Sequence, residues 1–523
     1  MENEGVRRRI FIRRAKKWGA LLLAAAMTVG LVGCGGSSGT GSTGSSGSSA
    51  SNTENGGDDD VYTVSMVILG NEQPDEQRIE DAMNEILMKE VGAKIDITCL
   101  SFGTFAQQLQ LMMTGNEKLD LVPVMRTSAN SYISSGQIID VSDLIDEYGD
   151  NIVSKLGEDM AKASSCGGFV YGVPIEREYF LDTAIIMRKD LIDKYNIDTS
   201  KIHSLADCEE AFATIKENEP GMKILLGSKD AGLFGDINYG VDMMLDGYGV
   251  LENGGQATEV TNLYESKQFT DLVTTAHDFY EKGYVDKEIL TSTDQASDVV
   301  KAGNGFSYIS SWKPSIDSEQ TMACGREMTA VRIMSCDAFD SSDLVSWLSW
   351  GIAQNSERPD IAMKVLNCLY DNEDLMNLLD WGQEGIDYEV IDEENGVIGY
   401  PDGVDDSNVG YHLTMYWELP MKYEHYIWEG YTREDMDAER EMNNTAMKSN
   451  AIGFMYDFSD LTNEITALNN VKNEYMPALT SGVADPETAL AEFNQKLYDA
   501  GLQKVIDEKN RQFQEWFANK NAQ

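Results

Sequence analysis

Two carboxylates on either side of an arginine are the residues of this sequence best placed for acid–base chemistry. Glu176 and Glu178 flank Arg177 in the stretch YGVPIEREYF, which begins at Tyr171. Glycoside hydrolysis uses two carboxyl groups that face each other across the scissile bond. The alternative is a salt-bridged loop, because the arginine can neutralise both neighbours. With 88 Asp and Glu in the chain, spacing alone does not decide between the two.

Aromatic side chains near the ends of predicted segments are a second chemical resource. They are Tyr179, Phe180, Trp312, Trp347, Trp350, Trp381, Trp417 and Trp428. Sugars stack their C–H faces on aromatic rings, and their hydroxyls pair with Asp, Glu, Asn or Arg. Trp312 follows SYISS and precedes Lys313-Pro314, so it stands at the end of a predicted strand. The alternative for each aromatic residue is a place in the core.

Other catalytic and metal-binding patterns are missing from the sequence. It contains no phosphate-binding loop of the GxxxxGK[ST] type, no HExxH and no GxSxG. The four His do not cluster, the seven Cys form no CxxC, and DEENG and DGVDDSN do not fit a calcium loop. We therefore expect no metal and no cofactor. The six Cys after Cys34 are either free thiols or disulfides, and Cys324 with Cys336 is the most plausible pair on separation.

The charge of the chain excludes one class of partner. The formal net charge of the 523 residues is −47, and a body this acidic repels the phosphates of nucleic acids. Hydrophobic residues make up 42% of the chain, which is enough for a sizeable core. We expect the charge to keep the protein soluble at an anionic surface.

Two runs of alternating strands and helices predict an α/β fold with largely parallel sheets. In the first run, strands 61–70, 93–102 and 119–125 alternate with helices near 75–91, 105–115 and 140–149. Ligands bind at the carboxyl ends of such strands. The candidates there are Asn71 and Glu72 after the first strand, and Arg126 and Thr127 after the third.

A second run begins after Tyr171, with strands near 183–188, 221–228 and 303–312 and helices near 204–218 and 269–282. A long amphipathic helical stretch covers 359–382, and three helices are expected at the C-terminal end. The last but one has a strong start signal, with Asp485 as cap and Pro486 at its first position. No low-complexity hinge separates the two runs, so they predict two lobes of one body.

The first 60 residues predict export and anchoring. The basic stretch RRRIFIRRAKK precedes an apolar segment, 18–33, that is shorter than the roughly 20 residues needed to span a bilayer. Leu31-Val32-Gly33-Cys34 resembles the lipobox of bacterial lipoproteins, which implies that Cys34 becomes the lipid-bearing N-terminus. The alternatives are an ordinary cleaved signal or a retained anchor. The Gly/Ser-rich stretch 35–60 is typical of a flexible linker.

Several segments in order resemble the extracellular solute-binding lipoproteins of bacterial ABC importers. They are GQIIDVSDLIDEYG, GGFVYGVPIEREYFLDTAIIMRKDLIDKYNID, SLADCEEAFATIKENEPG, NGFSYISSWKP and LVSWLSWGIAQNSERPDIAMKVLNCLY. The likeness is to the carbohydrate-type branch, distantly similar to maltose-binding protein, and to a Gram-positive subgroup with an extra C-terminal region. It spans nearly all of residues 61–518.

The resemblance implies a two-lobed, periplasmic-binding-protein-like (type II) α/β fold with a ligand cleft between the lobes. The first lobe would take 61–172 and about 350–385, and the second 173–349. Residues 386–523 would be mainly helical and pack across both lobes. Residues expected at the cleft are Asn71, Arg126, Glu176, Arg177, Tyr179, Trp312, Trp350 and Trp381.

By the same resemblance, the chain captures a sugar or oligosaccharide by lobe closure and delivers it to the membrane subunits of an ABC permease. It would act as a monomer on the extracellular face of the cell membrane, held by the lipid on Cys34, with no catalytic residues. The stretch IERE stands where relatives more often have a polar Asn-Arg pair, so a peptide or another polar solute stays open. The alternatives are a surface-anchored glycoside hydrolase or lyase, and a scaffold or adhesion protein.

Overall fold

The structure of the protein is a computed structural model that describes residues 61–115, 117–235, 237–333 and 337–521. The predicted signal segment, Cys34 and the linker lie outside these residues, as does Cys336. Cys99, Cys166, Cys208, Cys324 and Cys368, the cysteines that the structure describes, are free thiols.

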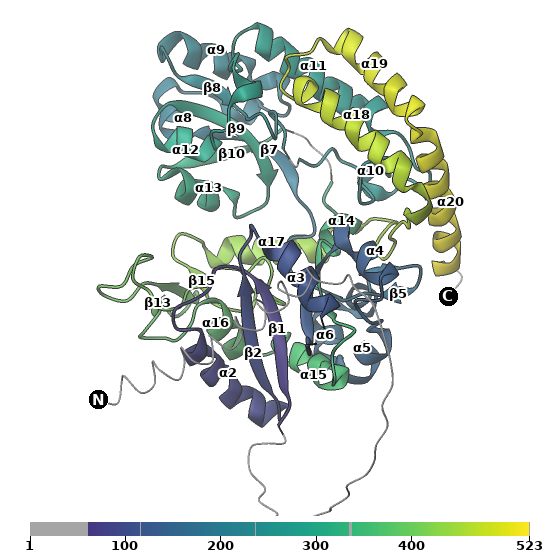
Figure 1. The fold of residues 1–523 in the computed structure, drawn as a ribbon. Coiled ribbons are helices and arrows are strands. Elements are labelled where there is room, and N and C mark those ends of the chain that lie inside the picture. Colours follow the sequence, from purple (N-terminus) through teal and green to yellow (C-terminus); the bar gives the residue numbers. More distant parts are fainter. Residues whose placement is uncertain (1–60, 116, 236, 334–336, 522–523) are drawn as a thin grey trace, which may run out of the picture. The chain divides into compact units, whose positions relative to one another are not determined.

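The first sheet joins strands from distant parts of the sequence (Figure 1). Its order is β2-β1-β3-β12-β6, and the strands are β1 Thr63–Leu69, β2 Lys94–Leu100, β3 Leu121–Met125, β6 Val173–Pro174 and β12 Leu348–Ile352. In β1, Val64, Met66 and Ile68 enter one hydrophobic cluster while Val67 and Leu69 enter another. Both faces of this strand are therefore covered, which explains its unbroken apolar sequence.

Helices cover the first sheet and connect its strands. They are α2 Glu76–Glu90, α3 Phe105–Thr114, α4 Arg126–Ser134, α5 Ser142–Tyr148, α6 Asp150–Leu156, α7 Glu158–Ala161, α15 Pro359–Leu369 and α16 Glu373–Asp380. The amphipathic stretch 359–382 is thus two helices, because Asn372 caps α16 by accepting a hydrogen bond from the backbone N–H of Leu375. A short hairpin, β4 Ser165–Cys166 and β5 Phe169–Val170, lies beside this lobe.

The second sheet has the order β10-β7-β9-β8. Its strands are β7 Asp182–Arg188, β8 Lys223–Leu226, β9 Gly305–Trp312 and β10 Met328–Arg332. The helices of this lobe are α8 Lys189–Tyr195, α9 Glu209–Asn218, α10 Glu252–Gly255, α11 Lys267–Glu281, α12 Ala296–Lys301 and α13 Ile316–Cys324. Short 3₁₀ helices lie at Thr199–Lys201, Ala206–Cys208, Leu263–Glu265, Ile289–Thr291 and Ser459–Leu461.

Neither sheet is as parallel as the sequence predicts. Strands β1, β2 and β3 are parallel, but β12 pairs antiparallel with β3 and β6 antiparallel with β12. In the second sheet β7 is antiparallel to both β9 and β10. The antiparallel pairs of the first sheet arise because β12 enters it from the second lobe and not from a covering helix.

The chain crosses between the two sheets along three segments. It passes from β6 to β7 through residues 175–181, and returns through α14 Ser342–Val345, between β11 Phe339–Asp340 and β12. It crosses again through α17 Arg433–Thr445, which connects β15 Ile427–Trp428 to β16 Met447–Lys448. Strand β16 pairs with β11.

Residues 386–523 divide between the lobes, and their first part is not helical. Strands β13 Glu389–Asp392 and β14 Val397–Gly399 form a small sheet with β15, and Tyr411, Leu413 and Met415 enter the core cluster of the first lobe. The C-terminal helices are α18 Thr462–Thr480, α19 Pro486–Asp499 and α20 Leu502–Lys520. The cap predicted at Asp485 is confirmed, since its side chain accepts from the N–H of Glu487.

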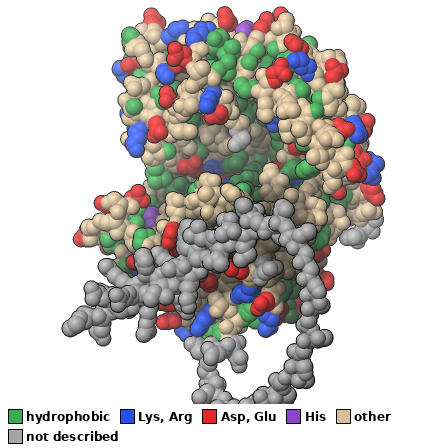
Figure 2. Space-filling view, in the orientation of Figure 1, with side chains coloured by type: hydrophobic (Ala, Val, Ile, Leu, Met, Phe, Trp, Pro, Cys, Tyr) green, Lys and Arg blue, Asp and Glu red, His purple; other side chains and the backbone are tan. Residues whose placement is uncertain are grey.

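Helices α18 and α19 pack on the second lobe beside α11, whereas α20 runs on from them so that its end lies near α4 and β5 of the first lobe (Figure 1). The reason for the packing on the second lobe is their apolar faces: Phe493, Leu497 and Phe513 share one buried cluster with Phe212 and Phe279. Figure 2 shows acidic and basic side chains interspersed over the helices at the top of the view. Among the described residues, none of the helices combines the length and the hydrophobicity that crossing a membrane requires.

Candidate functional site

A cleft of about 830 Å³ takes residues from the first lobe, the second lobe and α18. Ligand pockets in proteins typically enclose about 300–1,000 Å³. Its polar lining residues include Arg126, Lys229, Asp230, Asn238, Asp343, Lys472 and Asn473, and its aromatic ones are Tyr239, Tyr264 and Trp347. This mixture can hold a solute that presents both hydroxyl groups and apolar faces.

Arg126 projects from the end of β3 as the first residue of α4, the place that the sequence predicts for a ligand-binding side chain. Its Nη1 donates to the carbonyl oxygen of Ser342 at 3.0 Å, and its Nη2 donates to that of Phe454 at 3.0 Å. Its Nε lies 3.1 Å from Oδ1 of Asp343. The guanidinium therefore ties the first lobe to the crossing segment of α14.

Asp343 is the carboxylate that faces Arg126 in the cleft. Its Oδ1 also accepts a hydrogen bond of 2.8 Å from the backbone N–H of Leu245, a residue with φ of 91°. Burial raises the pKa of Asp343 to about 6, against the opposing effect of Arg126. A group with this pKa changes its charge near neutral pH, so the polarity of the cleft depends on pH there.

An aromatic row leads from the surface to the cleft. The ring of Phe102, 57% exposed, lies 6.3 Å from that of Trp417, and Trp417 lies 5.7 Å from Trp347. The guanidinium of Arg177 lies 4.8 Å over the Trp347 ring. Trp347 thus offers a ring of fixed orientation inside the cleft, which is the kind of surface that sugar rings stack on.

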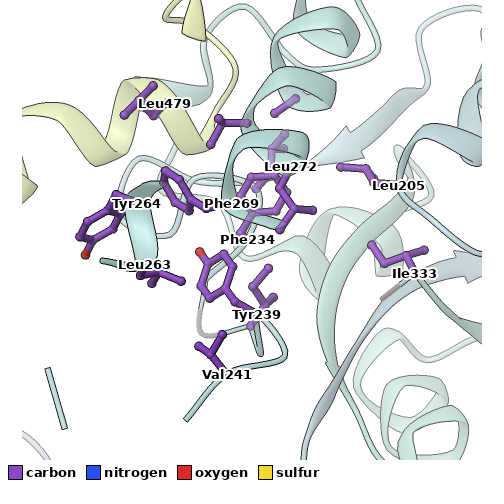
Figure 3. Close-up of a cluster of buried hydrophobic side chains, with 14 of the residues drawn as sticks. Leu205, Phe234, Tyr239, Val241, Leu263, Tyr264, Phe269, Leu272, Ile333 and Leu479 are labelled. Atoms are coloured by element: carbon purple, nitrogen blue, oxygen red, sulfur yellow. The ribbon is translucent and has the colours of Figure 1, made fainter. Parts of the chain in front are cut away.

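The second lobe contributes a wall that rests on its core (Figure 3). The cleft is lined on this side by Tyr239, Val241, Leu263 and Tyr264, which belong to the buried hydrophobic cluster that Figure 3 shows. Leu479 of α18 belongs to the same cluster but does not line the cleft. The ring of Tyr264 packs edge-on against Phe269 with centroids 5.2 Å apart. Such packing fixes the orientation of the wall before any solute binds.

Of the eight residues predicted at the cleft, Arg126 is the one that lines it. Arg177 does not line it, but its guanidinium lies over the ring of Trp347, which does. Asn71 is exposed at the end of β1, where its carbonyl oxygen accepts from Gln73. Tyr179 is 5% exposed, and its hydroxyl donates to the carbonyl oxygen of Ile175, so it is a buried structural residue and not a contact for solute.

Three predicted tryptophans lie elsewhere. Trp350, with no exposed surface, is in the centre of the first sheet, and its Nε1 donates to the carbonyl oxygen of Glu418. Trp381, 3% exposed, packs among His412, His425 and Trp428. Both side chains are therefore part of the core in this structure, and neither lines the cleft.

Trp312 ends β9 as predicted but faces a different hollow, of about 380 Å³, beside α17. The Arg332 guanidinium lies 4.6 Å over its ring. The helix α17 comes from a part of the chain more than a hundred residues away, so the sequence around Trp312 carries no sign of it.

The carboxylate pair Glu176 and Glu178 is taken up by salt bridges. Glu178 Oε2 lies 2.8 Å from Lys422 Nζ, and Glu176 Oε1 lies 3.3 Å from Arg440 Nε. Burial raises the pKa of Glu176 to about 7, although Arg440 opposes this. Both side chains are buried, so the salt-bridged alternative describes them, and they do not flank the cleft.

Most residues that line the cleft are not among those that the sequence predicts there. Lys229 and Asp230 follow β8, at the kind of strand end where ligands bind in α/β sheets. Trp347 is one of the aromatic residues near predicted segment ends, but its sequence neighbours do not distinguish it from the others. Lys472 and Asn473 lie inside a helix and gave no signal. The described residues include no group of three or more His, Cys, Asp or Glu that could hold a metal ion.

Other hollows are less suited to a solute. One of about 860 Å³ lies in the second lobe and is lined by Gln256, Gln268 and Asp271. Tyr239 lines both this hollow and the cleft. The first-lobe residues Arg126 and Thr127 line only the cleft of the two, so the cleft is the one that a movement between lobes would open or close.

Comparison with known proteins adds two family matches and one sequence relative. A family model for bacterial extracellular solute-binding proteins matches residues 71–376, and a model for a domain of unknown function, DUF3502, matches residues 450–518. A carbohydrate ABC transporter substrate-binding protein from Streptococcus pneumoniae serotype 4 is 25% identical over 474 residues. The match covers 88% of this chain and 92% of that protein.

Solved structures show the same fold. The N-glycan transport solute binding protein NgtS from Streptococcus pneumoniae is similar with a TM-score of 0.77 and 24% identity, covering 88% of this chain and all of that one. The complex of NgtS with Man1GlcNAc has a TM-score of 0.69 and 23% identity, covering 87% and 99%. At 23–24% identity, these likenesses show that the chains share a fold.

Proposed function

This chain belongs to the bacterial extracellular solute-binding protein family and has its two-lobed type II fold, and we propose from this that it captures an oligosaccharide in the cleft and delivers it to an ABC permease. The observation that carries the proposal is the cleft of about 830 Å³ with Trp347 beside the Arg126–Asp343 pair. An aromatic ring receives the apolar face of a sugar, and the charged pair can exchange hydrogen bonds with its hydroxyls.

The name of the pneumococcal relative supports carbohydrate as the class of solute, since that protein is a carbohydrate ABC transporter substrate-binding protein. The aromatic row supports more than one sugar ring. Phe102, Trp417 and Trp347 offer successive rings with centroids 6.3 and 5.7 Å apart, so a chain of sugars has more than one surface to stack on.

Capture works by a change in the population of lobe arrangements. A solute that contacts both lobes favours the closed arrangement by the contacts that exist only there. Arg126 and Asp343, which already join α4 to α14, lie at the site where such closure would act.

The anchoring part of the proposal rests on residues 1–60. The lipobox-like Leu31-Val32-Gly33-Cys34 supports cleavage before Cys34 and a lipid on its sulfur. The Gly/Ser-rich stretch 35–60 would then leave a monomeric body free to turn at the outer face of the membrane. Closed lobes would be the form presented to the permease.

A thermal-shift screen tests the proposal. The full-length protein, purified in detergent, is melted with Man1GlcNAc, maltotriose, N-acetyllactosamine, short peptides and polyols. A solute at a hundred times its dissociation constant adds about 2.7 kcal/mol to stability. We expect a shift with at least one glycan, recovered chemically unchanged. A shift with peptides alone would contradict the proposal and favour a peptide receptor. A glycan recovered in cleaved form would contradict it and favour a hydrolase.

A further inference from the structure

The segment that matches the domain of unknown function forms part of the cleft. Helix α18 lies within residues 450–518 and supplies Lys472, Asn473, Met476, Pro477 and Thr480 to the cleft lining. These positions recur at the spacing of one helical face. A whole face of α18 therefore borders the space between the lobes.

Close backbone contacts hold α18 in this position. Leu468 and Leu479 are buried in the core cluster of the second lobe, to which Tyr264 also belongs (Figure 3). After the helix, Gly482 has φ of 75°, and a Cβ atom there would lie 2.2 Å from the carbonyl oxygen of Ala276. Only glycine allows this approach to α11. The helix is thus a rigid wall.

The same segment also holds the polar groups of the cleft. The carbonyl oxygen of Phe454 accepts from Arg126 Nη2 at 3.0 Å, and that of Tyr456 accepts from Asn130 Nδ2 at 3.0 Å. From α20, the buried Lys509 donates to the carbonyl oxygen of Met244 at 3.3 Å. Met244 precedes Leu245, whose N–H contacts Asp343.

The exposed face of α18 has the chemistry to contact a sugar. Asn473 is exposed, and its amide offers both donors and an acceptor, as a sugar hydroxyl requires. Met476 and Pro477, on the same face, are apolar and can receive C–H groups. Lys472 adds a donor, with its Nζ 5.8 Å from the centre of the Tyr248 ring.

We propose that α18 is a specificity-determining wall of the cleft, with Asn473 as its principal hydrogen-bonding contact to a bound glycan and Lys472 as a second. This inference rests on the proposed function and assigns a task to the C-terminal region of unknown function. It places the residues that choose among glycans outside the part of the chain matched by the solute-binding family model.

The test compares two matched substitutions in α18. Asn473→Ala removes the amide from the cleft, whereas Asn470→Ala removes an exposed amide that does not line it. The full-length protein in detergent is titrated by calorimetry with Man1GlcNAc and with any other glycan that the wild type binds. We expect Asn473→Ala to weaken the binding of at least one glycan about tenfold, because that is the effect of losing one good hydrogen bond. Asn470→Ala should bind as the wild type does.

Unfolding temperatures separate a contact from a structural role. Both variants should melt within a degree or so of the wild type, because both side chains are exposed. Affinities of Asn473→Ala within twofold of Asn470→Ala would overturn the inference while leaving the proposed function intact. A weaker affinity that comes with a lower melting temperature would also overturn it. A wild type that binds no glycan would overturn the proposed function, and this inference with it.

Discussion

The Lys422 ammonium lies 2.8 Å from a carboxylate oxygen of Glu178, and the two side chains are 2% and 6% exposed. Lys313, at the end of β9, lies 3.6 Å from the other oxygen of the same carboxylate. Burial by itself would raise the pKa of Glu178, but Lys313, Lys422 and Arg177 outweigh it and hold the pKa well below its usual range. The residue that the sequence offered as a catalytic acid is an anchor between the lobes.

Lys422→Met should therefore destabilise the protein strongly. Lys422 pairs with Glu439 as well as with Glu178. The substitution would therefore leave two buried carboxylates without the ammonium group that they share. Breaking a buried pair in this way costs about 3–5 kcal/mol. Urea unfolding measures the loss, with Lys267→Met as control, since that side chain is 83% exposed and its pair contributes under about 1 kcal/mol. Equal losses for the two variants would show that the buried pair has no special weight.

Trp347→Ala and Trp312→Ala distinguish the cleft from the hollow beside α17. Trp347 lines the cleft, and losing its ring should weaken glycan binding more than about tenfold, as for a central aromatic contact. Trp312 lies in the other hollow, so its variant should bind glycan as the wild type does. Calorimetric titration of both variants checks this. Loss of binding in Trp312→Ala alone would move the site to the position that the sequence predicted.

Glu418→Gln should change how stability depends on pH. Glu418 has no exposed surface, one of its oxygens accepts from the N–H of Leu69 at 2.8 Å, and burial raises its pKa to about 8. Between pH 4.5 and 8 the native state holds a proton that the unfolded state has lost. Stability contributed by this group is thus present at low pH and falls as pH rises, by about 1.4 kcal/mol per pH unit.

The glutamine variant cannot ionise, so its stability should fall less steeply than that of the wild type over this range. Urea unfolding at pH 5, 6, 7 and 8 gives the two slopes. Since other carboxyl groups titrate in both proteins, the difference between the slopes is the quantity to compare. Parallel slopes would mean that Glu418 is ionised in the native state at neutral pH.

Lys509→Met tests how much α20 stabilises the segment that borders the cleft at Leu245. Lys509 has no exposed surface and donates to the carbonyl oxygens of Met244 and Gly249 at 3.3 and 3.2 Å, and it pairs with Asp246. Removing the ammonium should cost about 3 kcal/mol or more, because Asp246 would lose its partner. Lys504→Met, on the exposed side of α20, is the matched control. If Lys509→Met is as stable as this control, the segment from Met244 to Gly249 needs no support from α20.

Cys34→Ser should release the protein from the membrane. If Cys34 carries the lipid, the variant lacks the sulfur atom to which the lipid is attached. Fractionation of cells into membrane and medium measures the change, with the buried Cys208→Ser as a control for the loss of a thiol elsewhere. Retention of Cys34→Ser in the membrane fraction would favour a retained apolar anchor instead.

Local patterns predicted the elements well. The apolar run of β1, the Asp485–Pro486 start of α19 and the placing of Arg126 after β3 all depend on neighbours in the sequence, and the structure has them at those positions. Trp350 and Trp312 show that such local patterns do not predict what surrounds a side chain. Trp350 lies in the middle of β12, enclosed by Glu418 and the first-lobe core, whereas Trp312 ends β9 and is contacted by α17.

The sequence by itself determined the α/β class, the two runs of strands and helices and the acidic charge, because each follows from composition or from periodicity over a few residues. Only the tertiary structure decided that Glu178 is an anchor, that Trp347 and not Trp312 lines the cleft, and that α18 forms one of its walls. The physical reason is that a cleft is made by contacts between segments hundreds of residues apart. Such contacts depend on how apolar faces pack and leave no mark in the sequence beside any one of the residues they join.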